Sequence, residues 1–168
     1  MRAIVLTEAN RLDMQDVPRP EPRAGQVRIR TAACAICTTD LEMMAGDDRV
    51  TRPAILGHEW AGTVDAAGSP GDVGLVGKPC VAENVLSDGG EVGFEHPGGY
   101  GAFLVTEAAN VHVLPDDLPM PAATLVEPLA VCVRAMRRRP TPGFSFSAIT
   151  AAGKRRSSGT ASCTRNFT

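Results

Sequence analysis

Residues 34–60 read C-A-I-C-T-T-D-L-E-M-M-A-G-D-D-R-V-T-R-P-A-I-L-G-H-E-W and lie between two stretches with the pattern of β-strands. The first, residues 25–31, alternates apolar and polar side chains, which is the period of a strand with one buried face. The second, residues 60–68, has glycines where neighbouring backbones come close. Between them, residues 39–45 fit one or two helical turns, with Thr39 or Asp40 as the N-cap. The strand over residues 25–31 therefore delivers Cys37 to a loop before a helix.

The same stretch contains side chains that bind metals. Cys37 offers a sulfur, His58 a nitrogen and Glu59 an oxygen, a mixture that favours tetrahedral zinc over magnesium or calcium. A further candidate is Glu127, in the run T-L-V-E-P-L-A-V-C-V-R-A-M-R-R. Three protein ligands with a fourth position left to water or substrate are typical of catalytic zinc, so we predict an open metal site.

Further short strands surround this stretch, separated by turns rich in glycine and proline. Residues 84–99 read as a glycine-rich loop without cysteine, so a second, structural zinc is not expected. Many short strands followed by helical material predict a mainly β fold with peripheral helices, a small and partly open barrel. The expected strands are residues 1–6, 11–17, 78–83, 102–106 and 110–114, and residues 122–139 are expected to be helical with an interruption at Pro128.

Four motifs resemble those of the medium-chain zinc-dependent alcohol dehydrogenase family and occur in the same order. They are A-I-C-T-T-D at residues 35–40, G-H-E at 57–59, G-G-Y-G-A-F at 98–103 and E-P-L-A at 127–130. The resemblance covers residues 1–139. It is strongest to the polyol and threonine dehydrogenase branch, which has glutamate in the E-P-L motif. The resemblance implies that residues 1–139 form the GroES-like zinc-binding catalytic domain of such an enzyme.

The resemblance also implies roles for individual residues. Cys37, His58, Glu59 and Glu127 form the metal site, and Cys34 of the C-x-x-C pair stays outside it. Two alternatives remain open for the glutamates, since each either binds zinc directly or stands behind it and holds the metal-bound water.

Two further residues take part in the implied catalysis. The Thr39 hydroxyl would begin a proton relay from the alcohol. Asp40 would orient His58 through the second nitrogen of the ring.

The implied reaction is oxidation of a small-molecule alcohol or polyol, with hydride transfer to NAD or NADP. The family's nucleotide-binding Rossmann domain should begin near residue 140, yet no hydrophobic strand followed by G-x-G-x-x-G is present there. We therefore expect the chain to be a catalytic-domain fragment with negligible turnover. Two alternatives are a zinc-binding module without catalysis and a metal-free GroES-like structural domain. The choice of alcohol, the choice between NAD and NADP, and a homo-oligomeric state of the full-length relative are left open.

Residues 140–168 differ in composition from the rest of the chain. They are dominated by small and basic residues without an apolar period, so we expect an atypical, disordered tail, with a frameshifted or truncated reading frame as its origin. All 19 acidic residues precede it, and seven of the 17 basic residues lie from Arg137 onward. No interleaved aromatic residues support binding of nucleic acid.

The location of the chain is predicted from what its sequence lacks. The chain has neither an apolar run long enough for a membrane span nor an export signal at its start, so we expect a cytoplasmic protein without membrane contact. Its five cysteines are then expected to be thiols.

Overall fold

The computed structural model describes residues 1–137. The strands are β1 (Arg2–Glu8), β2 (Arg11–Asp16), β3 (Gln26–Cys34), β4 (Trp60–Ala67), β5 (Pro79–Ala82), β6 (Phe103–Glu107) and β7 (Val111–Val113). The helices are α1 (Thr38–Ala45), α2 (Met120–Ala123) and α3 (Val126–Arg137), and 3₁₀ turns span Pro70–Leu75 and Ala108–Asn110. Every expected strand is present, with bounds that differ from the expected ones by three residues or fewer.

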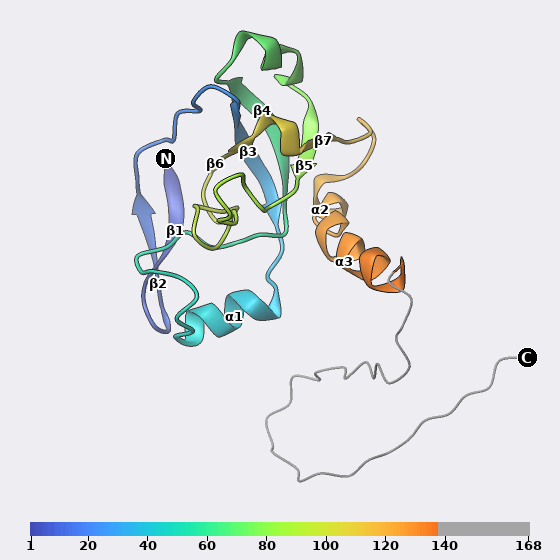
Figure 1. The fold of residues 1–168 in the computed structure, drawn as a ribbon. Coiled ribbons are helices and arrows are strands. Elements are labelled where there is room, and N and C mark those ends of the chain that lie inside the picture. Colours follow the sequence, from blue (N-terminus) through green and yellow to red (C-terminus); the bar gives the residue numbers. More distant parts are fainter. Residues whose placement is uncertain (138–168) are drawn as a thin grey trace, which may run out of the picture. The chain divides into compact units, whose positions relative to one another are not determined.

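Five antiparallel strands form the central sheet in the order β6-β3-β4-β5-β7. The hairpin of β1 and β2 lies on one side of this sheet, and α2 and α3 lie on the other (Figure 1). Within residues 1–137 the edge strands β6 and β7 do not pair with each other, so the sheet stays open. The prediction of a mainly β fold with a partly open barrel and peripheral helices is confirmed.

Strand β3 departs from simple alternation at one position. Val27 and Ile29 are fully buried, and Arg28 between them is only 6% exposed. The guanidinium of Arg28 is buried because it reaches two carboxylates, Asp65 on β4 and Glu21 in the proline-rich segment, each at 2.6 Å. A buried charge is tolerated where such partners satisfy its hydrogen-bond donors.

Two main apolar clusters support the ends of the strands that carry the candidate ligands. The larger cluster lies against the central sheet and contains Val27, Ile29, Trp60, Val64, Cys80, Leu86, Val92 and Leu104. The smaller one joins β1, α1 and the segment before His58, and contains Leu6, Met43, Val50, Leu56 and Phe94. Full burial of a large apolar side chain contributes about 1.5–3 kcal/mol. The smaller cluster therefore fixes α1 relative to the segment that precedes His58.

Two details of the expected helices are wrong. The N-cap of α1 is Cys37 rather than Thr39 or Asp40, because Asp40 lies in the first turn and its side chain accepts a hydrogen bond from the Cys37 amide. Pro128 does not interrupt the last helix, since it lies in the first turn of α3, where its missing N–H costs no helical hydrogen bond. The break lies earlier, between the end of α2 and the start of α3.

The prediction of a disordered tail over residues 140–168 concerns residues outside the described part of the chain. Among residues 1–137, no helix has both the length and the apolar character needed to cross a membrane. The four cysteines in this range are free thiols, as expected: Cys34, Cys37, Cys80 and Cys132.

Candidate metal centre

Cys37 lies at the start of α1, just beyond the end of β3. Its amide donates a 2.8 Å hydrogen bond to Oδ2 of Asp40, which is fully buried. Its Sγ lies 3.7 Å from Oγ1 of Thr39. The local sequence thus places a sulfur ligand, a hydroxyl and a buried carboxylate within one helical turn.

His58 and Glu59 follow a backbone turn that only glycine adopts easily. Gly57 has φ +97°, and a Cβ on it would lie 2.7 Å from the Tyr100 ring. The G-G-Y motif at residues 98–100 holds this turn, since its amides donate to the carbonyl oxygens of residues 55–57 at 2.8 to 3.0 Å. The side chain of Asn84 donates a 2.8 Å hydrogen bond to the His58 carbonyl oxygen. The glycine-rich loop therefore fixes the backbone from which both ligands project.

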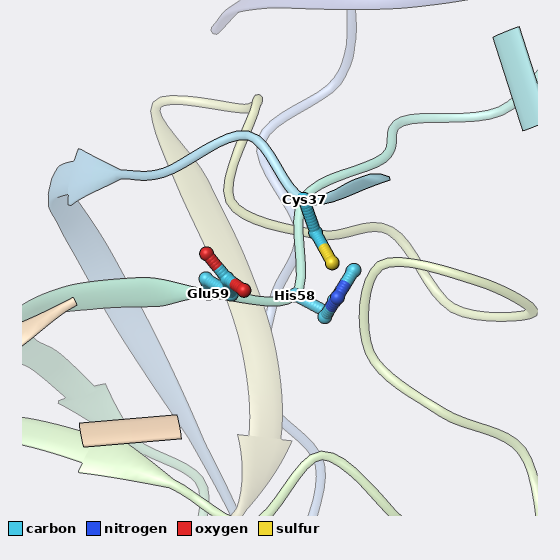
Figure 2. Close-up of side chains that lie close together, drawn as sticks. All are labelled: Cys37, His58 and Glu59. Atoms are coloured by element: carbon cyan, nitrogen blue, oxygen red, sulfur yellow. The ribbon is translucent and has the colours of Figure 1, made fainter. Parts of the chain in front are cut away.

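The side chains of Cys37, His58 and Glu59 converge, as Figure 2 shows. One ligand atom of each lies within 4.8 Å of those of the other two. Ligand atoms on one tetrahedral zinc ion lie roughly 3.5 Å apart, which is within the 4.8 Å limit that these three atoms satisfy. His58 is 7% exposed and Glu59 is 9% exposed, so the donors are largely shielded from water. This set of sulfur, nitrogen and oxygen donors fits zinc.

Asp40 faces the imidazole of His58 from the other side. Its Oδ1 lies 3.5 Å from Nδ1 of His58, longer than a good hydrogen bond, and neither atom has another partner. Burial by itself would lower the pKa of His58, but the Asp40 carboxylate and the nearby Cys37 sulfur together outweigh it and raise the pKa to about 9. Burial would likewise raise the pKa of Asp40, and His58 and the Cys37 amide together bring it below its usual value. With Nδ1 facing Asp40, Nε2 of His58 is the nitrogen left for a metal.

Cys34 lies outside this group of donors. Its sulfur packs against Gly57, where an added Cβ would lie 2.8 Å from it, and burial raises the pKa of its thiol to about 12. It is therefore a protonated, packed thiol.

Glu127 on α3 is not among the converging donors either. It is half-buried, and burial is the largest cause of its raised pKa, with the nearby charge of His58 opposing the shift and Glu59 adding to it. The structure thus brings three of the four predicted ligands together and leaves Glu127 beside them.

Neither of the two other histidines joins the converging donors. His96 pairs with Asp88 at 2.9 Å, and His112 is exposed and lies 3.8 Å from Glu83. Sequence reasoning missed Phe94, whose ring lies against that of His58. No local pattern marks Phe94, because its contact with His58 arises from the folding of the loop.

Comparison with known proteins gives consistent results. The family model described as "Alcohol dehydrogenase GroES-like domain" matches residues 23–116. The L-threonine 3-dehydrogenase of Anaeromyxobacter sp. (strain Fw109-5) is 32% identical over 139 residues, which cover 68% of this chain and 39% of that protein. The D-altritol 5-dehydrogenase of Agrobacterium fabrum (strain C58) is 30% identical over 156 residues, covering 82% of this chain and 46% of that protein.

Among solved structures, the NADH complex of the rspB alcohol dehydrogenase of Escherichia coli CFT073 superimposes with a TM-score of 0.76 at 25% identity. The match covers 84% of this chain and 46% of that one. The chain therefore spans less than half the length of these relatives. Since the family model matches more than half of the 168 residues, and the fold and converging donors agree with it, the chain belongs to the alcohol dehydrogenase GroES-like domain family.

Proposed function

We propose that this chain is the zinc-binding catalytic half of an NAD(P)-linked alcohol or polyol dehydrogenase. The observation that carries the proposal is the convergence of Cys37, His58 and Glu59 within 4.8 Å. The relatives support the class of reaction, because two are dehydrogenases of threonine and of a polyol, and one structural neighbour is a complex with NADH. The substrate would accordingly be a small alcohol or polyol.

Cys37, His58 and Glu59 would hold the ion. When bound, zinc would act as a Lewis acid on the oxygen of the alcohol. Asp40 faces Nδ1 of His58 across 3.5 Å and is completely buried, which supports a role in leaving Nε2 as the nitrogen for the metal. Thr39, with its hydroxyl 3.7 Å from Cys37 Sγ, would hydrogen-bond the alcohol at Oγ1 and form the first member of a proton relay.

Glu127 has a separate part in this proposal. It is half-buried beside His58 and Glu59 and carries a raised pKa, yet it lies outside the converging donors. These features favour a role for Glu127 in holding the metal-bound water. They argue against direct binding of zinc by Glu127.

The hydride acceptor would be bound by a further part of the protein. Residues 1–137 contain no parallel β-α-β unit, and the relatives are more than twice as long as the matched region. We propose that residues 1–139 form the catalytic domain, that residues 140–168 lie outside it, and that the 168-residue chain alone does not reduce NAD. We also propose that the protein is located in the cytoplasm.

The test is metal content after zinc loading and removal of excess ion. The wild-type chain should retain about one zinc per chain. The double variant Cys37→Ala, His58→Ala should retain almost none, and Cys132→Ala, at an exposed thiol on α3, should behave like the wild type. Equal, near-zero zinc in all three would overturn the proposal in favour of a metal-free structural domain. A full-length protein that binds zinc but neither binds NAD(P) nor oxidises alcohols would favour a zinc-binding module without catalysis.

A further inference from the structure

Three side chains stack beside the candidate metal centre, and we refer to them as the Arg49–Phe94–His58 stack. The rings of His58 and Phe94 have centroids 4.7 Å apart and are inclined by 33°. The guanidinium carbon of Arg49 lies 3.7 Å from the centroid of the Phe94 ring. Phe94 thus contacts both a cation and the imidazole that we assign to the metal.

The outer end of the stack is held by a carboxylate. Nη2 of Arg49 lies 3.0 Å from Oε1 of Glu91. The amide of Phe94 donates a 3.2 Å hydrogen bond to the backbone carbonyl oxygen of Glu91. One short turn therefore carries both the ring and the partner of the guanidinium that covers it. Arg49 is fixed from its own side as well, since the next residue, Val50, is buried in the smaller core cluster.

The stack also connects the metal centre with the core. Phe94 is 7% exposed and packs in the smaller cluster with Leu6, Met43 and Leu56. A histidine ring rotates about two bonds, and the Asp40 contact at 3.5 Å is too long to fix that rotation by itself. A packed ring against the imidazole face restricts the rotation that the Asp40 contact leaves free.

We propose that Phe94, covered by the Arg49–Glu91 pair, is a positioning residue that holds the His58 imidazole in its metal-binding orientation. This rests on the proposed zinc site, but it concerns residues outside the ligand set. Groups behind a metal ligand typically change metal affinity by 10- to 100-fold when they are removed. Arg49 and Glu91 are partly exposed, so their pairing adds little to stability and acts through the position of the ring.

The experiment measures Zn²⁺ affinity by competition with a chelator, and the visible absorption of the Co²⁺-loaded chain. Phe94→Leu should weaken Zn²⁺ binding at least about 10-fold and alter the Co²⁺ absorption bands. Phe94→Tyr keeps the ring and should bind like the wild type. The matched control is Phe103→Leu on β6, because Phe103 also lies under arginine guanidinium groups but contacts Arg19 and Arg28 instead. Phe103→Leu should leave both readouts unchanged.

Wild-type affinity and an unchanged Co²⁺ spectrum in Phe94→Leu would overturn the proposal. If Phe94→Leu fails to fold, Arg49→Gln decides, since it removes the guanidinium at the exposed end and leaves the core intact. It should weaken Zn²⁺ binding several-fold, and an unchanged affinity would overturn the proposal. Failure of the proposed function is distinct from these outcomes, because then the wild-type chain itself would bind no metal.

Discussion

At the residue scale, the site depends on a few positions where the backbone conformation or the burial restricts the residue type. Gly57 turns the backbone with φ +97° directly before His58, and Asp40 faces His58 while fully buried. The motifs around them are visible in the sequence, so the residue types at the site were predictable. The hydrogen bond that Asp40 accepts from the Cys37 amide was not predictable, because it depends on the residue at which α1 begins.

Gly57→Ala should destabilise the chain. The added Cβ would lie 2.7 Å from the Tyr100 ring and 2.8 Å from Cys34 Sγ, and the backbone would keep an unfavourable φ. We expect a loss of about 2 kcal/mol in the free energy of unfolding. Denaturant unfolding followed by the fluorescence of Trp60, the only tryptophan, measures this loss. Gly74→Ala is the control, since its Cβ would meet nothing within 4 Å, and equal losses in both variants would contradict the expectation.

Zinc uptake should release a proton from His58. The facing Asp40 and the nearby Cys37 together outweigh burial and raise the His58 pKa to about 9, so the metal-free imidazole is protonated near neutral pH, while zinc binds the neutral ring. Affinity should therefore rise with pH until about 9. Asp40→Asn removes the charge, lowers the pKa of His58 and should reduce proton release. Calorimetry in buffers of different ionisation enthalpy measures the number of protons released when zinc binds. Equal release by both proteins would refute the mechanism, because the contribution of Cys37 is common to both.

At the scale of elements, strands were more predictable than helix ends. The alternation of apolar and polar residues along β3 is a local pattern, and it identified the strand. In β4, Gly62 marks a close approach of the two strands, since a Cβ there would lie 2.4 Å from the Arg30 carbonyl oxygen of β3. Helix ends depend on capping contacts, so α1 begins at Thr38 and α3 accommodates Pro128 in its first turn. The burial of Arg28 depends on partners from other segments and follows from no local period.

Arg28→Met should weaken the attachment of the proline-rich segment to the sheet. It leaves Asp65 and Glu21 without the guanidinium that each contacts at 2.6 Å. Hydrogen bonds to a charged group contribute about 2 kcal/mol, and the loss should stay near this value because Glu21, with a side chain that is 70% exposed, is hydrated once Arg28 is removed. Arg19→Met, at a side chain that is 51% exposed, should cost less than about 1 kcal/mol. Urea unfolding of both variants gives the two values, and similar costs would show that burial of Arg28 is not the cause.

Helix α3 should open locally before the sheet unfolds. None of its residues is buried, and Leu129, Val133 and Met136 are all substantially exposed. Local opening needs little free energy where few apolar contacts are broken. Amide hydrogen exchange should therefore be faster along α3 than along β3, whose Val27 and Ile29 are fully buried. Equal protection of the two elements would show that α3 is held by more than the described contacts.

At the scale of the whole molecule, the candidate ligands come from the two ends of the connection between the paired strands β3 and β4. Cys37 follows β3, and His58 and Glu59 directly precede β4. A metal ion bound to all three joins the two sides of this connection and binds only the folded state.

Zinc should raise the thermal stability of the chain. A ligand present at about 100 times its Kd stabilises the folded state by about 2.7 kcal/mol if it does not bind the unfolded state. Thermal unfolding with zinc and with excess chelator measures the difference in Tm. The Cys37→Ala variant should show little or no shift, because it lacks the sulfur ligand. A Tm shift in this variant as large as that of the wild type would mean that zinc binds at another site.

The sequence by itself determined the strands, the mainly β class, the family resemblance and the candidate donor atoms at Cys37, His58 and Glu59. These depend on short periods and contiguous motifs, which are local properties of the chain. Only the tertiary structure decided that Glu127 lies outside the converging donors, that Arg28 is buried and that Phe94 stacks on His58 under Arg49. The reason is physical, since these contacts join segments that are distant in sequence, and their geometry is set by how the core and loops pack.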